Sequence, residues 1–316
     1  MTGSPAVGVI GIGAMGMPIA KNLHRKGFSV AVRDIRSLAH EEAIAFGMPA
    51  FDSPALLAKT ATHLIVVVVN VAQIREALFG EHGVTSIRGP VRTVLLCSTI
   101  APQDTVDVAN RLADFGIRAI DAPISGGPER ASQGTMSMML AGDTQTIADC
   151  EDVLAAMSDK RFHISEVIGD GARMKLVNNL LAGINLVGSA EAFALGTRLG
   201  LDPACIYEVI TASSGASWVF EDRMARVLRD DFKPRAFAHI LEKDVGLAVA
   251  MAQEAGSATP LGESALARFR QMLLQGMGQL DDAAVVKTYL QGIDADPLGD
   301  KTPSGDRDNT TDRQSP

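Results

Sequence analysis

The chain has 316 residues, a formal net charge of -8 and 47% hydrophobic residues. This length exceeds what one hydrophobic core usually serves, so we expect two domains in a globular protein. Lys and Arg are scattered among acidic residues and form no basic stripe, which argues against nucleic acid and favours small molecules as partners.

The three cysteines, Cys97, Cys150 and Cys205, lie far apart and lack the spacing of metal ligands. This predicts reduced thiols and no metal site. The strongest apolar run, residues 64–69, is too short to span a bilayer, and no basic leader precedes the first apolar run. We therefore expect a cytoplasmic protein with no membrane partner.

Residues 7–34 have the pattern of a strand, a glycine-rich turn, a helix and a second strand, with Gly11, Gly13 and Gly16 in the G-x-G-x-x-G pattern of dinucleotide-binding proteins. The first glycine permits the tight turn, the second lets the backbone approach a pyrophosphate, and the third allows close helix packing. Free amides at the helix start attract the anion. The candidate cofactor loop is Gly11, Ile12, Gly13, Ala14, Met15 and Gly16.

Asp34 ends the second predicted strand. A carboxylate there can accept hydrogen bonds from ribose hydroxyls and repel a 2′-phosphate, so we expect NAD in preference to NADP. Arg33 and Arg36 act against this preference, because an arginine at that corner can bind a 2′-phosphate; either can equally be a solvated surface charge or stack on adenine.

Residues 62–70, 91–99 and 117–125 are short β-branched runs separated by helical stretches, which predicts a parallel sheet. Asn70 and Thr99 follow strand ends, where open α/β sheets bind ligands, although ordinary turn residues also occur there. The loop Ser125, Gly126, Gly127 offers a hydroxyl and two amides without side chains that could bind a carboxylate, or it can simply form a turn.

Residues 171–193 form a long apolar segment in which Lys175 is the one charged residue between Met174 and Ala190. A helix places Lys175 on an arc of about 120° with the residues Asn178, Asn179, Asn185 and Ser189. The arc could be a solvated stripe, but solvated faces usually carry Glu, Lys and Arg, whereas amides and a single amine suit a polar cleft.

Four blocks in this order resemble the β-hydroxyacid dehydrogenase family, which includes 3-hydroxyisobutyrate dehydrogenases: "GVIGIGAMGMPIAKNL", "STIAPQ", "DAPISGG" and "GARMKLVNN". Residues 68–84 and 215–224 are most similar to L-threonate dehydrogenases. The resemblance implies an α/β fold with an N-terminal Rossmann-type, doubly wound sheet, then a long interdomain helix and an all-α C-terminal domain. It also implies a homodimer or homotetramer.

The implied division is an NAD-binding domain at 1–170, an interdomain helix at 171–194 and an all-helical substrate and oligomerisation domain at 195–293. The composition of residues 294–316 predicts a disordered tail. Helical patterns support the third part, with Asp202 and Pro203 as a helix start and Asp281 and Asp282 as another. The tail has almost no large apolar residue.

Matched position by position, the resemblance implies that Lys175 is the catalytic general acid and base. The implied substrate-binding residues are Ser125, Gly126, Gly127 and Asn179. The implied cofactor contacts beyond the glycine loop and Asp34 are Val69, Asn70, Thr99 and Lys243. The residues before Asn70 are Val68 and Val69, where many relatives have Leu-Pro.

The expected function is NAD-dependent oxidation of a small hydroxy carboxylic acid, in particular a four-carbon sugar acid such as L-threonate. A desolvated lysine takes the hydroxyl proton while hydride passes to the nicotinamide. The alternatives within the family are a tartronate semialdehyde reductase and a 3-hydroxyisobutyrate dehydrogenase. An alternative of another class is a dinucleotide-binding protein without catalysis, because folds can outlast their chemistry.

Overall fold

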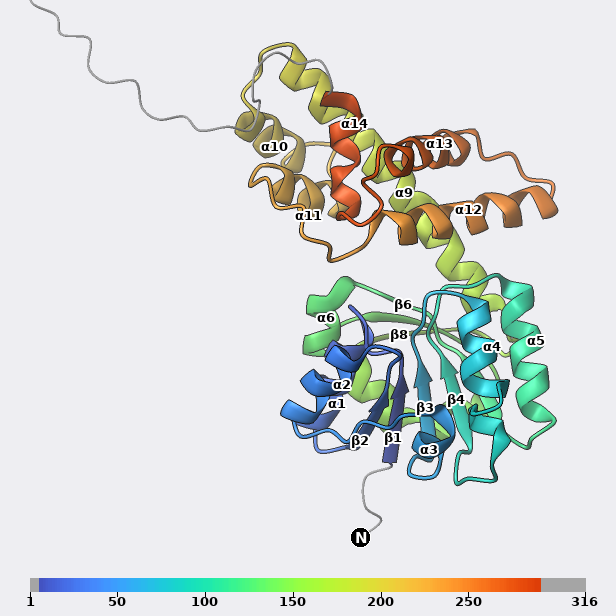
Figure 1. Cartoon of the computed structure of the whole chain (residues 1–316). Coiled ribbons are helices and arrows are strands. Elements are labelled where there is room, and N and C mark those ends of the chain that lie inside the picture. The colour runs from blue at the N-terminus through green and yellow to red at the C-terminus, as the bar shows by residue number, and fades with distance from the viewer. Residues whose placement is uncertain (1–5, 291–316) are drawn as a thin grey trace, which may run out of the picture.

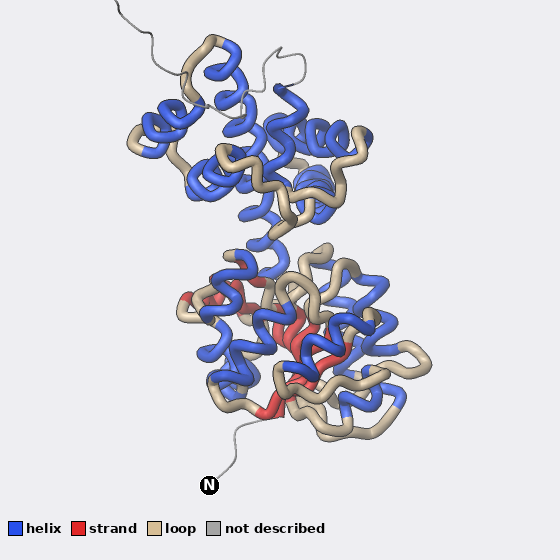
Figure 2. The backbone as a smooth tube through the Cα atoms, turned by 60° about the vertical axis from the view of Figure 1, so that its left-hand side comes forward, coloured by secondary structure: helices blue, strands red, loops and turns tan. Residues whose placement is uncertain are grey.

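The computed structural model describes residues 6–290, and the predicted tail at 294–316 lies outside the described residues. The described chain forms two lobes, an α/β lobe and a helical lobe, joined by the long helix α9 (Asp170–Arg198) (Figure 1). The α/β lobe contains every strand of the described chain, and the other lobe consists of helices and loops (Figure 2).

The α/β lobe is built on an eight-stranded sheet with the order β2-β1-β3-β4-β5-β7-β6, in which β8 also pairs with β7. Strands β1 to β5 pair in parallel, whereas β7 runs antiparallel to β5 and β6 and parallel to β8. The strands are β1 (Ala6–Ile10), β2 (Ser29–Arg33), β3 (His63–Val66), β4 (Thr93–Leu96), β5 (Arg118–Asp121), β6 (Ile124–Ser125), β7 (Ser137–Ala141) and β8 (Lys160–Ser165).

Helices cover both faces of this sheet, because successive residues of a strand point to opposite sides and both sides are apolar. Val9 and Ile65 contribute to one buried core, and Ile10 and Leu64 contribute to the other. This confirms the predicted doubly wound α/β fold. The helices of the lobe are α1 (Gly16–Arg25), α2 (Ser37–Ala45), α3 (Pro54–Ala58), α4 (Val71–Phe79), η1 (Val84–Ser86), α5 (Pro102–Ala113), α6 (Gly127–Gln133), α7 (Thr144–Asp149) and α8 (Glu151–Met157).

The helical lobe packs around a third core that contains Phe193, Phe220 and Phe269. The predicted helix start at Asp202 is confirmed: its carboxylate accepts the amide of Cys205 at 3.1 Å, and proline opens the helix. The second predicted start opens a 3₁₀ helix. The elements are α10 (Pro203–Thr211), α11 (Trp218–Val227), α12 (Ala238–Glu254), α13 (Pro260–Leu274), η2 (Asp282–Val286) and α14 (Lys287–Leu290).

Helix α9 begins against β5, β7, β8 and α5 and continues between α11, α12 and α13. Among the described helices it alone is long and apolar enough to cross a membrane, judged by length and composition. Its apolar residues instead meet the other helices: a Cβ on Gly183 would lie 2.6 Å from Val245 Cγ2, so the glycine allows α12 to approach closely. The apolar run therefore belongs to the core of the helical lobe.

Candidate active site

The glycine loop between β1 and α1 has the geometry that a dinucleotide phosphate requires. Gly11 has φ +86°, and a Cβ there would lie 2.3 Å from the carbonyl oxygen of Val67. A Cβ on Gly16 would lie 1.9 Å from the carbonyl oxygen of Gly11. Both positions therefore exclude any side chain, whereas Gly13 faces open space apart from Arg36 at 3.8 Å.

The amides at the start of α1 are available to a ligand. Those of Gly13, Ala14 and Met15 have no hydrogen-bond partner among the described residues, and no side chain caps the helix. A cavity of about 870 Å³ opens in front of them. Because free amides and the helix dipole attract anions, this loop fits a pyrophosphate.

The corner after β2 differs from the expectation of a free carboxylate. Asp34 Oδ1 accepts the backbone amide of Arg36 at 3.0 Å and its Nε at 2.9 Å, and Oδ2 accepts the amide of Ile12 at 2.9 Å and Arg36 Nη2 at 3.2 Å. Burial acts to raise the pKa of Asp34, but these hydrogen bonds outweigh it and hold the pKa below its ordinary value. All four acceptor positions of this carboxylate are therefore occupied.

The residues after β3 form a capped turn. Asn70 Oδ1 accepts the amide of Gln73 at 2.9 Å and caps α4, and Gln73 Oε1 accepts the amide of Val69, the residue before the cap, at 2.9 Å. Ser98 Oγ accepts the amide of Val68 at 2.9 Å and joins this turn to the end of β4. The side-chain oxygen of Asn70 is thus bonded to the start of α4, and of its side-chain groups only the NH₂ is left for a ligand.

Thr99 and Lys243, which are far apart in the sequence, meet where the two lobes face each other. Lys243 Nζ, from α12, donates to the carbonyl oxygen of Thr99 at 2.6 Å. It also lies 2.6 Å from Asp244 Oδ1, an ion pair without the alignment of a hydrogen bond, so that this buried oxygen has no hydrogen-bond partner. One amine therefore connects the end of β4 with the helical lobe.

Lys175 is buried on the first turns of α9, with 7% of its surface exposed, and makes no hydrogen bond or ion pair among the described residues. Burial lowers its pKa to about 8; Asp244 acts against this shift and Lys243 adds to it. One turn later, Asn179 Nδ2 donates to Asp244 Oδ2 at 2.8 Å and Oδ1 accepts from Asn178 at 3.0 Å. Lys175, Asn179 and Asp244 thus form a buried polar cluster at this end of α9, whereas Asn178 is exposed.

Further along α9 the polar arc does not continue as a binding surface. Ser189 is buried, and its Oγ donates to the carbonyl oxygen of Asn185 at 2.5 Å within the same helix. It lies 14 residues beyond Lys175, which corresponds to roughly 21 Å along the axis. The expectation of one continuous stripe therefore fails beyond the first turns, because the helical lobe encloses α9 there.

The loop Ser125, Gly126, Gly127 leaves β6 and opens α6. Gly126 has φ +131° and Gly127 has φ +76°, conformations that favour glycine. A Cβ on Gly127 would meet nothing within 4 Å, so the backbone there faces open space. Ser125 pairs with Ser137 of β7, against which α9 also packs, so β7 supports both the loop and the helix that carries Lys175.

Comparisons with known proteins agree with this geometry. A family model described as the NAD binding domain of 6-phosphogluconate dehydrogenase matches residues 6–169, and one described as the NAD-binding of NADP-dependent 3-hydroxyisobutyrate dehydrogenase matches residues 169–289. The chain is 38% identical to an L-threonate dehydrogenase of Cupriavidus necator, over 90% of this chain and 95% of that protein. The chain belongs to the β-hydroxyacid dehydrogenase family.

Two further relatives agree. An L-threonate dehydrogenase of Escherichia coli K12 is 37% identical over 90% of this chain and 94% of its own length. A crystal structure of a 3-hydroxyisobutyrate dehydrogenase from Salmonella typhimurium superposes with a TM-score of 0.84 at 34% identity and covers 90% of this chain and all of that one. Family membership confirms the predicted class, a hydroxyacid dehydrogenase that binds NAD.

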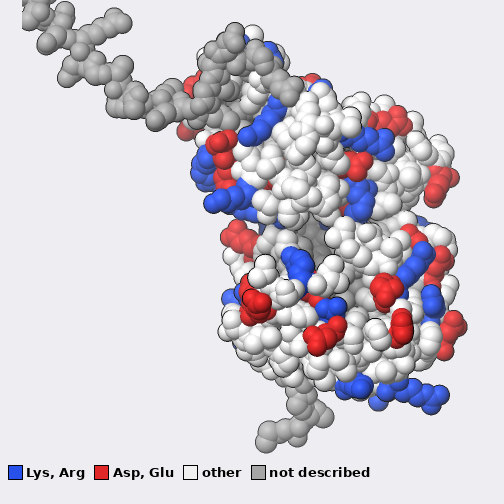
Figure 3. Space-filling view, viewed as in Figure 1, with Lys and Arg blue, Asp and Glu red and all other residues white. Residues whose placement is uncertain are grey.

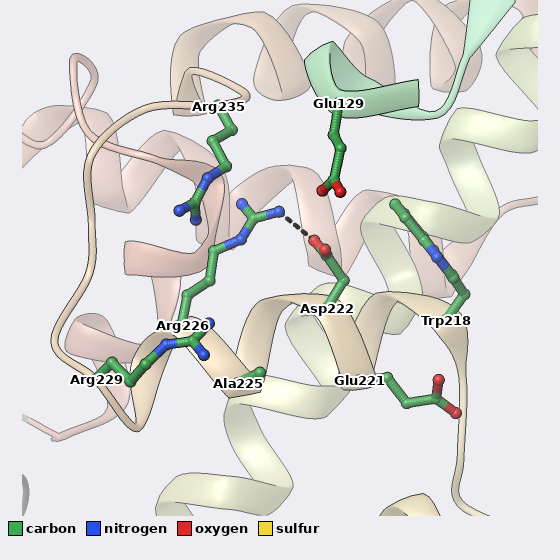
Figure 4. Close-up of a pocket in the computed structure, with 8 residues that line it drawn as sticks. All are labelled: Glu129, Trp218, Glu221, Asp222, Ala225, Arg226, Arg229 and Arg235. Carbon is green, nitrogen blue, oxygen red and sulfur yellow. Dashed lines mark hydrogen bonds and ion pairs between the residues drawn. The ribbon is translucent and has the colours of Figure 1, made fainter. Parts of the chain in front are cut away.

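The dehydrogenase has a second cavity, of about 440 Å³, where α6 of the α/β lobe faces α11 of the helical lobe. Figure 4 shows Glu129 on one side and Arg226, Arg229 and Arg235 on the other, with Asp222 between them and bonded to Arg226. Trp218 borders this cavity, and the Arg130 guanidinium lies 5.3 Å from its ring centroid. This contact bridges the two lobes beside the Ser-Gly-Gly loop.

The visible surface of the dehydrogenase carries charges of both signs. Figure 3 shows a face that is hollowed between the lobes, on which Lys and Arg are interspersed with Asp and Glu. Sequence reasoning missed Asp244 and the ion pair of Arg36 with Asp34. It also missed a further buried carboxylate, Asp121, at the end of β5. The signal for Asp244 was its place beside Lys243 in "LEKDVGLA", an acidic residue next to a predicted site residue.

Proposed function

We propose that this dehydrogenase oxidises a four-carbon sugar acid such as L-threonate with NAD as the oxidant and Lys175 as the general base. The observation that carries the proposal is the buried amine of Lys175, which makes no hydrogen bond or ion pair within residues 6–290 and has a pKa lowered to about 8 beside Asn179 and Asp244. The names of the C. necator and E. coli relatives support the substrate.

The side chains have distinct tasks in this proposal. Neutral Lys175 takes the proton of the substrate hydroxyl, and protonated Lys175 returns it in the reverse reaction. Asn179 has one N–H left after its bond to Asp244 and donates it to the substrate. Ser125, Gly126 and Gly127 hold the carboxylate with the serine hydroxyl and the backbone amides. The lobe-bridging contacts at Lys243 and Trp218 limit the access of water.

The residues that would hold NAD lie along one edge of the sheet. The free amides from Gly13 to Met15 bind the pyrophosphate, and exposed Ile35 and Leu38 at the cavity mouth offer apolar surface to the adenine. Asn70, Val69, Thr99 and Lys243 lie toward the nicotinamide end. When bound, NAD supplies the hydride acceptor of the reaction.

The difference in affinity between NAD and NADP is expected to be small, because Arg36 can contact the 2′-phosphate of NADP. Arg36 is hydrogen-bonded to the carboxylate of Asp34, yet 57% of its side chain is exposed. Its guanidinium can therefore turn toward a 2′-phosphate. We expect Arg36→Ala to weaken NADP binding about tenfold or more, from the loss of one charge-assisted contact, and to leave NAD binding within about threefold. Calorimetric titration with each dinucleotide measures both constants, with Arg33→Ala as the control. Equal losses for NAD and NADP would remove Arg36 from cofactor selection.

L-threonate is expected to exceed 3-hydroxyisobutyrate in kcat/KM by about tenfold or more. The site holds a spare polar group, the second N–H of the Asn179 amide, which a methyl-branched acid leaves unpaired. Each such loss costs about 1–3 kcal/mol. Initial rates with C3 to C5 hydroxy acids, read as NADH absorbance and with D-threonate as the stereochemical control, give the ranking.

A higher kcat/KM for 3-hydroxyisobutyrate, the substrate in the name of the Salmonella relative, would overturn the substrate and leave the family and Lys175 in place. A preference for reducing tartronate semialdehyde would do the same.

We also propose a cytoplasmic homodimer or homotetramer. Exposed apolar side chains on α9, Met174, Val177 and Leu181, support it, because a second copy can cover them. The three cysteines are free, with Cys97 and Cys150 buried, which suits a reducing compartment.

A further inference from the structure

Asp121 is a buried carboxylate to which neither the resemblance nor the proposed chemistry gives a task. It is the last residue of β5, and 1% of its surface is exposed. Its Oδ2 accepts the backbone amide of Gly169 at 2.9 Å and that of Ala172 at 3.0 Å, and both donors belong to the start of α9. A side chain from the sheet therefore caps a helix whose N-cap residue, Gly169, lies 48 residues later in the chain.

The start of α9 depends on this distant cap. The helix begins after Gly169, which has φ +102°, and no side chain of its own caps it. Uncapped helix starts leave amides without partners, and buried amides need them. Gly171 makes the contact possible, because a Cβ there would lie 2.9 Å from Asp121 Cγ and 2.8 Å from the carbonyl oxygen of Met139. The helix and the sheet thus meet at a fixed separation.

Both halves of the proposed site continue directly from this junction. Beyond the end of β5, the chain reaches Ser125 four residues after Asp121 and enters the proposed substrate loop. On α9, Lys175 follows Ala172 by three residues, which is about 4.5 Å along the helix axis. A shift of the helix start relative to β5 would therefore move the amine relative to the loop.

We propose that Asp121 is a positioning residue that fixes Lys175 relative to the Ser125-Gly126-Gly127 loop by capping α9. The proposal rests on the proposed function for the roles of Lys175 and the loop. Small displacements of a catalytic group are costly, because proton transfer needs hydrogen-bond distance to the substrate. Loss of the cap should thus lower kcat more than it lowers the affinity for NAD, which binds elsewhere along the sheet edge.

The charge on Asp121 adds a pH dependence. Burial raises its pKa to about 6, against the lowering effect of the amides of Ala172, Gly169 and Gly171. The titratable groups that face it are Asp170 of α9, whose charge adds to the rise, and the buried thiol of Cys97 after β4. As the pH falls through about 6, the carboxylate becomes neutral, its bonds to the helix start weaken, and kcat should fall.

Two variants separate positioning from simple stability. Asp121→Ala is expected to lower kcat about tenfold or more and to change the dissociation constant of NAD less than twofold. Asp121→Asn keeps an oxygen that can accept both amides, so it should retain most of kcat and lose the decrease near pH 6. Asp143→Ala is the matched control, because Asp143 caps α7 through the amide of Thr146 at 2.7 Å, away from the site.

The pH profile is measured in the direction of reduction, with NADH and the oxo acid that oxidation of the substrate forms. In this direction protonated Lys175 supports turnover at every pH below 8. A lower Tm with unchanged kcat in Asp121→Ala, as for Asp143→Ala, would overturn the proposal. So would a decrease near pH 6 that persists in Asp121→Asn. If Asp121→Ala does not fold, the Asn profile still decides.

A readout without substrate separates this proposal from the function on which it rests. The rate at which an amine-reactive acetylating reagent modifies Lys175, followed by peptide mass spectrometry, reports the surroundings of the amine. We expect Asp121→Ala to change this rate at least threefold relative to wild type and Asp143→Ala to leave it unchanged. An unchanged rate in Asp121→Ala refutes the positioning role, whereas wild-type protein that turns over no hydroxy acid refutes the proposed function alone.

Discussion

Replacing Lys175 with alanine is expected to lower kcat by about 10²–10⁴-fold, the usual range for loss of a general acid or base. The dissociation constant of NAD should stay within about threefold, because the proposed pyrophosphate site consists of backbone amides at the start of α1 and not of Lys175. Stopped-flow or steady-state rates with L-threonate give kcat, and calorimetric titration gives the affinity. Lys59→Ala, which removes an exposed lysine at the end of α3, is the control for loss of charge.

The pH dependence supplies an independent check on Lys175. With a pKa of about 8, the amine is neutral above that pH and can act as a base, so oxidation should rise as pH increases through 8. Reduction needs the protonated amine and should fall over the same range. Wild-type-like turnover in Lys175→Ala, or profiles that rise in both directions, would remove Lys175 from the mechanism.

Local patterns predicted the fold well because its elements follow local rules. The glycine turn, the β-branched runs of the sheet and the Asp202 helix start each depend on residues within a few positions of one another. Other features needed tertiary contacts. Burial of β7 and its antiparallel pairing with β5 and β6 could not be read from periodicity, since a short apolar run has the same pattern in either direction.

The arrangement of the candidate site was predictable where one helix carries its residues, and less so where distant segments complete it. Lys175 and Asn179 are one turn apart, so their shared face followed from helix geometry. The partner of Asn179 is Asp244, 65 residues away, and nothing in the local sequence pairs them. The same limit applies to Asp34, where Arg36 is close in sequence but only the chain path around the turn brings its guanidinium onto the carboxylate.

Packing also excludes some polar residues of α9 from the candidate substrate contacts. The arc on α9 contains Ser189 by geometry, yet the helical lobe buries it and its hydroxyl bonds within the helix. Polar side chains in a helix often return to their own backbone when no other partner is near. A polar stripe in a sequence therefore marks a binding surface only over the length that the rest of the fold leaves open.

Asp281→Ala is expected to cause a large loss of stability in the helical lobe. The carboxylate is fully buried and accepts Arg226 Nη1 at 3.1 Å, the amide of Arg235 at 2.8 Å and the amide of Ala283 at 3.2 Å. It thus joins α11, the segment before α12 and the start of η2. Removal leaves a buried guanidinium with less compensation and several amides without acceptors.

The expected cost is about 3–5 kcal/mol in the free energy of unfolding, typical of removing one partner from a buried pair. In a chain of this size that corresponds to a decrease in Tm on the order of 10 °C. Asp231→Ala is the matched control, because Asp231 pairs with Arg235 at 2.8 Å with both side chains partly exposed, and exposed ion pairs contribute little to stability. Urea and thermal unfolding of the two variants give the comparison.

The unfolding midpoint of Asp281→Asn should fall between those of the two alanine variants, since the amide oxygen keeps part of the acceptor capacity but the charge opposite Arg226 is lost. Equal midpoints for Asp281→Ala and Asp231→Ala would show that this buried network does not hold the helical lobe together.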